Sequence, residues 1–239
     1  MKSALYNSLP LLLLFGLLIN SCTIDNENYD EAAQMILQNY GGELAYGEGV
    51  GSGAGNKGST YKYLSVELSE SPLLNYGISP GLVMTHITAE FAKGAPDDLV
   101  EIQVELNSLP SEDGPMDFSL TTALEEAKLI NEKEEILHRC IDKIALNDIS
   151  ELTTLFTDQY NEWFANNDGE QVVRGINTMI GDYGGSLFRG YDIMRVDSIP
   201  DKDFILISGL MLGTTANANI GVIIDPALSL DHSIVAIRY

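Results

Sequence analysis

The sequence predicts an α+β protein in which helices are followed by a bent antiparallel sheet, with a small N-terminal β-α-β lobe before them. Three observations lead to this prediction. Over residues 60–108, apolar and polar residues alternate on either side of a helical pattern, and three further helical patterns follow between residues 122 and 183. The remaining residues up to 239 are strand-like and are separated by short, turn-rich segments.

The first segment of the chain resembles the leader of a bacterial lipoprotein. Its apolar run, residues 9–19, is shorter than the roughly 20 residues that span a bilayer, but it fits a signal-peptide core of about 7–15 residues. The sequence Ile19-Asn20-Ser21-Cys22 resembles the lipobox, with an aliphatic residue, a small residue before the cleavage point, and a cysteine. Asn20 departs from the small residue that is usual at its position.

The lipobox resemblance implies that residues 1–21 are a signal peptide and that Cys22 receives a diacylglycerol. Because two or more acyl chains anchor a protein stably, we expect attachment to a membrane of the cell envelope through this lipid. The polar segment of residues 23–31, which contains several acidic residues, resembles the surface-export signal of some Gram-negative lipoproteins. The expected location is therefore the outer membrane, on its periplasmic or its outer face. The alternative is a leader without lipid, in which Cys22 has no such role.

The charge of the chain narrows the choice of partners. It carries 35 acidic and 13 basic residues, which give a formal net charge of −22. Binding to nucleic acid requires clustered lysine and arginine, so nucleic acid is not an expected partner. Besides the membrane, a protein partner or a small ligand remains to be expected.

Residues 22–59 are predicted to form an acidic, glycine-rich tether that contains one short helix near residues 29–40. The glycine-rich part, residues 41–59, lacks the Gly-Lys-Ser/Thr sequence of a phosphate-binding loop and the preceding strand of a dinucleotide-binding loop. A flexible linker is therefore predicted for residues 41–59.

Residues 60–108 are predicted to form the β-α-β lobe. In its strands apolar residues occupy alternate positions, and in its helix they lie four positions apart. The residues concerned are Leu64, Val66 and Leu68, then Val83, Ile87 and Phe91, and finally Val100, Ile102, Val104 and Leu106. His86 lies on this helix, where a lone histidine is expected at the boundary of the core rather than as a ligand.

Residues 109–117 contain two prolines, a glycine and three acids, which predict a boundary before a second domain of residues 119–239. Helices are predicted over residues 122–145, from a capping box at residues 148–151 to about residue 164, and over residues 170–183. Strands are predicted over residues 188–197, 204–212, 220–224 and 233–239, joined as an antiparallel meander. The apolar run 204–212 predicts a strand that is buried on both faces.

Three helices followed by about four meandering strands resemble the NTF2-like (cystatin-like, α+β cone) superfamily. The resemblance implies a bent sheet that wraps around the longest helix and leaves a cavity. Members of the superfamily include isomerases, dehydratases and other enzymes, together with binding domains that have no catalytic activity. Their catalytic residues cannot be transferred to this chain, because no motif aligns with it.

Glu134, His138 and Asp142 form a polar row on the long predicted helix, since residues four apart lie on one face. Such a row is a candidate for proton transfer or metal binding. The interpretation that we favour is an exposed helix face with stabilising charge pairs. No zinc or serine-hydrolase motif occurs in the chain, and we expect no metal and no cofactor.

Five aromatic residues are candidates for lining the cavity. Tyr160 and Trp163 come from the second of the three helical patterns, and Tyr183, Phe188 and Tyr191 come from the following elements. Core packing is the interpretation that we favour, because aromatic side chains bury large areas. Cys140 is likewise expected to be a buried core residue rather than a catalytic thiol.

These observations favour a lipid-anchored envelope protein that acts in binding or assembly without catalysis. Two alternatives stay open. One is an NTF2-like enzyme with an acid or base in the cone, which requires a titratable group with a shifted pKa facing an open cavity. The other is a carrier that holds a small ligand in the same cavity.

Overall fold

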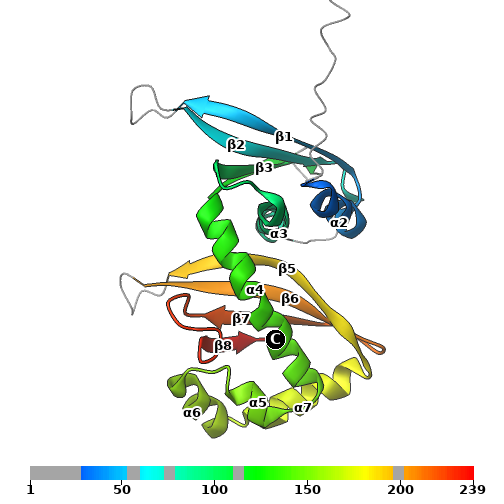
Figure 1. Ribbon diagram of the computed structural model, residues 1–239. Coiled ribbons are helices and arrows are strands. Elements are labelled where there is room, and N and C mark those ends of the chain that lie inside the picture. Colours follow the sequence, from blue (N-terminus) through cyan, green and yellow to red (C-terminus); the bar gives the residue numbers. More distant parts are fainter. Residues whose placement is uncertain (1–27, 53–59, 73–78, 110–115, 196–201) are drawn as a thin grey trace, which may run out of the picture.

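The computed structural model describes residues 28–52, 60–72, 79–109, 116–195 and 202–239. It confirms the α+β class, with two four-stranded sheets. Figure 1 shows the two sheets one above the other, with helices below the upper sheet and a long helix running from the upper part of the molecule to the lower. The signal peptide and the lipobox cysteine, Cys22, lie outside the described residues.

We call the elements before the long helix the first unit. They are α2 (Asp30–Tyr40), β1 (Glu43–Ser52), β2 (Thr60–Ser69), α3 (Pro80–Gly94), β3 (Leu99–Leu109) and β4 (Met116–Ala123). The strand order of this first sheet is β1-β2-β3-β4, and only β2 and β3 run parallel to each other. The predicted β-α-β lobe therefore corresponds to β2, α3 and β3.

The flexible linker predicted for residues 41–59 is wrong for Glu43–Ser52, which form β1. Gly49 and Gly51 of β1 lie opposite Tyr63 and Tyr61 of β2 in the antiparallel register. A Cβ atom at either glycine would collide with the opposite tyrosine ring. The glycines therefore leave room for two rings that cover the strand, as aromatic residues do beside glycine in other sheets.

The elements from the long helix onward form the second unit. They are α4 (Leu124–Ala145), α5 (Ile149–Thr153), α6 (Asp158–Asn166), α7 (Gly169–Ile180), β5 (Tyr183–Arg195), β6 (Asp203–Gly213), β7 (Ala218–Ile224) and β8 (Ile234–Arg238). The second sheet has the order β5-β6-β7-β8 with every pair antiparallel, which confirms the predicted meander.

Several predicted boundaries are corrected by the structure. The predicted second helix is interrupted at Phe156, which forms a bridge with Ile234, so that the segment between α5 and α6 covers the edge of β8. The third helix ends at Ile180, and the first strand of the meander already begins at Tyr183. Strand β6 is buried on only one face, because Leu206 and its alternate neighbours are half-buried.

Helix α3 lies between the two sheets (Figure 1). A helix that is covered on most of its surface must be largely apolar, and α3 follows this rule except at Thr85, His86, Thr88, Glu90 and the exposed Lys93. Its buried residues are Val83, Met84, His86, Ile87, Thr88, Ala89, Glu90, Phe91 and Ala92. His86 is thus fully buried, and the prediction of a boundary position was wrong, because the second sheet covers the face that it occupies.

Helix α4 takes part in both hydrophobic cores. Leu124 and Ala127 at its beginning pack into the core of the first unit. Ile130, Leu137 and Ile141 pack into the core of the second unit. A single rigid helix therefore connects the two cores.

We expect Leu137→Ala to lower the free energy of unfolding by about 2–5 kcal/mol, because it leaves a cavity at a fully buried site between α4 and β6. Urea denaturation would measure the loss. The control is Leu146→Ala at the end of the same helix, where the side chain is 72% exposed and a change within about 0.5 kcal/mol is expected. Equal effects of the two variants would contradict the assignment of Leu137 to the core.

Candidate functional site

A series of polar side chains connects the two units across α3 and α4. Glu90 of α3 is only 3% exposed and accepts a hydrogen bond from Lys93, with 2.8 Å between Oε1 and Nζ. The same ammonium group lies 3.2 Å from Oε2 of Glu134 on α4. Lys93 therefore holds together two carboxylates, one from each unit.

The charges in this series stabilise one another. Burial alone would raise the pKa of Glu90, but hydrogen bonds with His86 and Lys93 and their charges hold it below its usual value. Burial alone would lower the pKa of Lys93, but its hydrogen bond with Glu90 and the charge of Glu134 raise it above its usual value. Both groups are therefore ionised at neutral pH.

The imidazole of His86 extends the series to α2. Its Nδ1 lies 2.6 Å from the hydroxyl oxygen of Tyr40, and its Nε2 lies 3.7 Å from Oε1 of Glu90. Burial raises the pKa of Tyr40 to about 12, so the phenol keeps its proton at neutral pH. A carboxylate, an imidazole and a phenol in series can relay a proton, but these three residues line none of the concavities described below.

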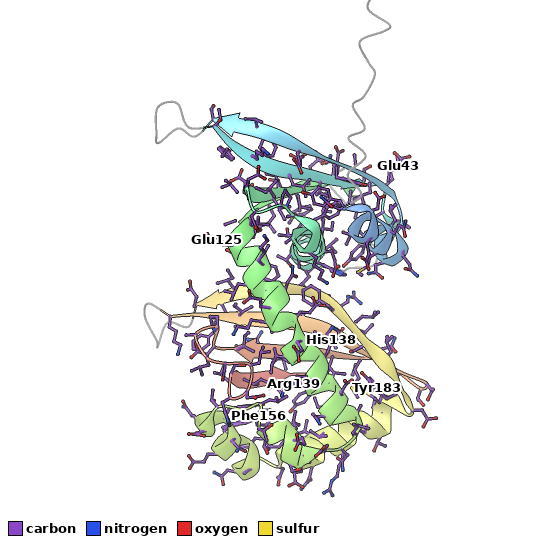
Figure 2. The ribbon with its side chains drawn as sticks, in the orientation of Figure 1. Glu43, Glu125, His138, Arg139, Phe156 and Tyr183 are labelled. Carbon is purple, nitrogen blue, oxygen red and sulfur yellow. The ribbon has the colours of Figure 1, made fainter. Side chains whose placement is uncertain are left out.

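The predicted polar row on α4 lies beside α3 and β5, with Glu134 and His138 partly buried and Asp142 exposed. Glu134 contacts Lys93 of α3 and also lies 3.4 Å from Nε2 of His138. His138 Nδ1 lies 2.7 Å from the hydroxyl of Ser186 on β5, and Asp142 accepts a hydrogen bond of 2.6 Å from Tyr183, also on β5. Figure 2 labels His138 and Tyr183 on these two elements.

The polar row does not converge on one point, because each member has a different partner. His138 contacts Ser186, whereas Asp142, one helix turn further along α4, accepts its hydrogen bond from Tyr183. Within the described part of the chain, no group of three His, Cys, Asp or Glu side chains is placed to hold a metal ion.

The five predicted aromatic residues do not line one cavity. Phe188 is buried and packs its ring 5.2 Å from that of His86. Tyr191 is buried and its hydroxyl lies 3.4 Å from Glu126 on α4. Tyr183 binds Asp142, so that only Tyr160 and Trp163 lie together at a concavity.

Tyr160 and Trp163 on α6 form a stacked pair beside an open groove. Their rings are 5.6 Å apart and inclined by 11°, and Trp163 is 52% exposed. The groove has a volume of about 460 Å³, and we call it the aromatic groove. It is lined by Thr157, Gln159, Tyr160, Trp163, Met194, Phe204, Ile223, Val235, Ala236 and Ile237.

Local contacts fix the position of the aromatic pair. The side chain of Thr157 caps the first turn of α6 by accepting a hydrogen bond from the backbone N–H of Tyr160. The hydroxyl of Tyr160 accepts a hydrogen bond of 3.0 Å from the backbone N–H of Ile237 on the edge strand β8. Tyr160 therefore covers a sheet edge and forms a rigid support for the exposed ring of Trp163.

The interior beneath the aromatic pair is nearly filled. A cavity of about 30 Å³ lies between α6, α7 and β8, which is about the space of one water molecule. Cys140 of α4 is fully buried in the same core, and burial raises the pKa of its thiol to about 12. The prediction of a packing role for Cys140 is confirmed, since such a thiol is inert.

Sequence reasoning missed Tyr40, Glu90 and Lys93. Glu90 and Lys93 follow His86 at positions that share a helix face, which is a signal that the sequence does contain. Nothing in the sequence links these residues to Tyr40 or to Glu134, because those contacts depend on the packing of α2 and α4 against α3.

We expect Glu90→Gln to reduce the acid sensitivity of the fold. Because the pKa of Glu90 is lowered in the folded state, its ionised form stabilises the protein above its unfolded pKa of about 4.3, and this contribution is lost as the pH falls through the folded value. At pH 7 the variant should lose about 1–3 kcal/mol, because a charged hydrogen-bond partner of Lys93 is removed.

Urea denaturation at pH 7 and at pH 3 would measure this difference. The gap in stability between wild type and Glu90→Gln should shrink at pH 3, whereas Glu135→Gln, at an exposed position of α4, should show no such gap at either pH. A gap that is unchanged at pH 3 would contradict the ionised state of Glu90.

Among the described residues, no helix is long and apolar enough to cross a bilayer. No protein-family model, no curated protein and no solved structure matches this chain. What the protein does must therefore be inferred from its own residues and their arrangement.

Proposed function

We propose that this protein is a lipid-anchored, non-enzymatic binding module of the bacterial cell envelope, with the aromatic groove as its binding site. The anchor is Cys22, on the strength of the lipobox resemblance of Ile19-Asn20-Ser21-Cys22. The location that fits this sequence is the outer membrane, on its periplasmic or its outer face.

The observation that carries the binding role is the half-exposed ring of Trp163 at the mouth of the aromatic groove. A groove of about 460 Å³ falls in the range of about 300–1,000 Å³ that is typical of small-ligand sites. Its walls are mostly apolar, and Thr157 and Gln159 add polar groups at one side, as in sites that orient a ligand with few hydrogen bonds. The class of ligand that fits is a neutral, largely apolar molecule with an aromatic or aliphatic body.

The order of elements from α4 to β8 supports a relationship with the NTF2-like superfamily, as a proposal. The interior between α4 and the sheet is occupied by Leu137, Cys140 and Ile141 of the helix. Because side chains of the helix fill this interior, the chain is more similar to the members of that superfamily that bind without catalysis than to the enzymes.

The alternative of an NTF2-like enzyme is favoured by one observation, the series Glu90–His86–Tyr40. A general acid or base must come within hydrogen-bond reach of its substrate. His86 and Glu90 are buried between the two units and line none of the three concavities described for this structure. The binding role is therefore better supported than an enzymatic one.

We expect Cys22→Ser to abolish lipid attachment, because the thiol is the atom that would carry the diacylglycerol. Cells that express the wild type or the variant would be labelled with a clickable fatty acid, and the purified chain would be examined for label. Undiminished labelling of the variant would rule out the anchor, and Cys140→Ser serves as the control that should label as the wild type does.

We expect Trp163→Ala to weaken binding of a neutral aromatic probe at least tenfold, because burying a large aromatic side chain contributes on the order of 1.5–3 kcal/mol. Titration calorimetry with naphthalenemethanol would measure this on the full chain in phosphatidylcholine nanodiscs, with empty nanodiscs as the blank. Trp163 is the only tryptophan of the chain, so its fluorescence reports occupancy of the groove in the wild type.

The matched control for this experiment is Met179→Ala on α7, an exposed apolar residue outside the aromatic groove. It should leave the affinity for the probe unchanged. Binding that is equally strong in Trp163→Ala and in the wild type would contradict the assignment of the groove.

A further inference from the structure

Two arginines of this acidic protein lack an ion pair among the described residues and share one groove. Lys133 also lacks an ion pair there, but it donates a hydrogen bond of 3.0 Å to the backbone carbonyl of Leu228. Seven lysines and arginines form ion pairs within the described part of the chain. These pairs are Lys62–Asp98, Lys93–Glu90, Lys128–Asp97, Arg139–Asp231, Lys143–Asp148, Arg174–Glu170 and Lys202–Asp225. Among the described residues, Arg189 and Arg238 have no ion-pair partner, and both line the same groove of about 480 Å³. We call it the arginine groove.

The arginine groove lies on the face of the second sheet that is turned away from α4. Gly209 of β6 faces α4, because a Cβ atom there would approach the side chain of Leu137. Ser208, its neighbour, therefore points to the opposite face. Ser208, Gly221 and Arg238 are register partners across β6, β7 and β8, so they form one row on that face.

A bulge in β5 directs Arg189 to the groove. Phe188 pairs with Gly209 and Gly190 pairs with Ser208, so that Arg189 has no opposite residue on β6. Bulges of this kind bend a strand and turn a side chain in a new direction. Gly190 has a φ of +128°, and a Cβ atom there would collide with the carbonyl of Leu82 on α3. The bulge and the glycine together bring Arg189 beside the first turn of α3.

Helix α3 supplies further groups to the groove. Ser79, the N-cap residue, and Leu82 line it, so the positive end of the helix dipole points toward the arginines. None of the described side chains that line the groove is acidic, although the chain as a whole carries a net charge of −22. The groove is therefore a positively charged concavity in a strongly negative protein.

We propose that the arginine groove binds a small organic anion, whose carboxylate or phosphate group lies between Arg189 and Arg238. The guanidinium group presents parallel N–H donors that match the oxygens of either anion. Ser208 and Asn219 offer further hydrogen bonds, and Leu82 and Leu206 form an apolar wall for the body of the ligand. This site is separate from the aromatic groove, with which it shares no lining residue.

Gly221 forms the floor of the arginine groove between Ser208 and Arg238. A Cβ atom there would lie 2.9 Å from the side chain of Leu206 and 3.5 Å from Cβ of Arg238. A larger residue at this position would therefore occupy part of the groove beside Arg238 and Leu206 without removing any charge.

Titration calorimetry with benzoate and with phenyl phosphate tests the proposal, on the full chain in phosphatidylcholine nanodiscs at low salt. At least one anion should bind with a dissociation constant of about 1 mM or below, and neutral benzamide should bind at least tenfold more weakly. Preference for one anion identifies the ligand group as a carboxylate or a phosphate. Affinity should fall as salt is added, because ions screen the arginines.

Arg189→Gln and Arg238→Gln should each weaken anion binding at least tenfold. The matched control is Arg174→Gln, which removes an exposed arginine of α7 outside the groove and should leave the affinity unchanged. The proposal is overturned if neither anion binds, if both groove variants bind as the wild type does, or if Arg174→Gln weakens binding as much as they do.

A second variant keeps the test decisive if an arginine variant does not fold. Gly221→Leu should block anion binding while both arginines remain, and circular dichroism would establish that it is folded. Binding of naphthalenemethanol in the aromatic groove should persist in this variant, which separates failure of this proposal from failure of the proposed function. Anion binding at wild-type strength in folded Gly221→Leu would overturn the placement of the site.

Discussion

The burial of α3 between two sheets is the constraint on which the rest of this structure depends. A helix that is covered on most of its surface has little solvent-facing area for polar residues, so His86 and Glu90 must find partners inside the protein. Glu90 is compensated by Lys93, which also holds Glu134 of α4, and His86 is bonded to Tyr40 of α2. Removing the partner of a buried polar group costs about 1–3 kcal/mol, because the group that remains is left without a hydrogen bond. The pairing therefore favours one arrangement of the two units over others in which these groups would be buried without partners.

The same packing creates the surface concavities. The approach of α3 to β5 requires the glycine at position 190, and the bulge that accompanies it turns Arg189 out of the strand register. The arginine groove thus needs α3 from the first unit and β5 to β8 from the second, and neither unit contains it alone. The aromatic groove has a different origin, since Tyr160 of α6 covers the edge of β8 and supports Trp163 beside it. Edge protection and packing therefore also shape the two grooves.

Local patterns predicted the parts of the fold that local forces determine. The alternation in β2 and β3, the stripe of α4 and the turn-rich connections of the meander lie within short windows of sequence, and the structure confirms these elements. Strand β1 was missed because its glycines suit a strand only when Tyr61 and Tyr63 of another strand cover them. Tyr160 and Trp163 were two of five aromatic candidates, and they stack because they are three residues apart on one helix. Tyr40, His86 and Glu134, in contrast, are connected only through tertiary packing. Arg189 and Arg238 carried no sequence signal, since a bulge and a strand register bring them together.

The distribution of charge differs between the buried acid–base series and the arginine groove. In a chain with 35 acidic residues, a basic side chain that lies near any structural carboxylate is neutralised by it, as Lys93 and Arg139 are. Arg189 and Arg238 line one groove and have no such partner among the described residues. A bulge and a glycine with positive φ direct Arg189 to this groove, and both features need specific residues. An anion in the groove would supply the missing partner, whereas Glu90 is already paired with Lys93 and lines none of the three concavities.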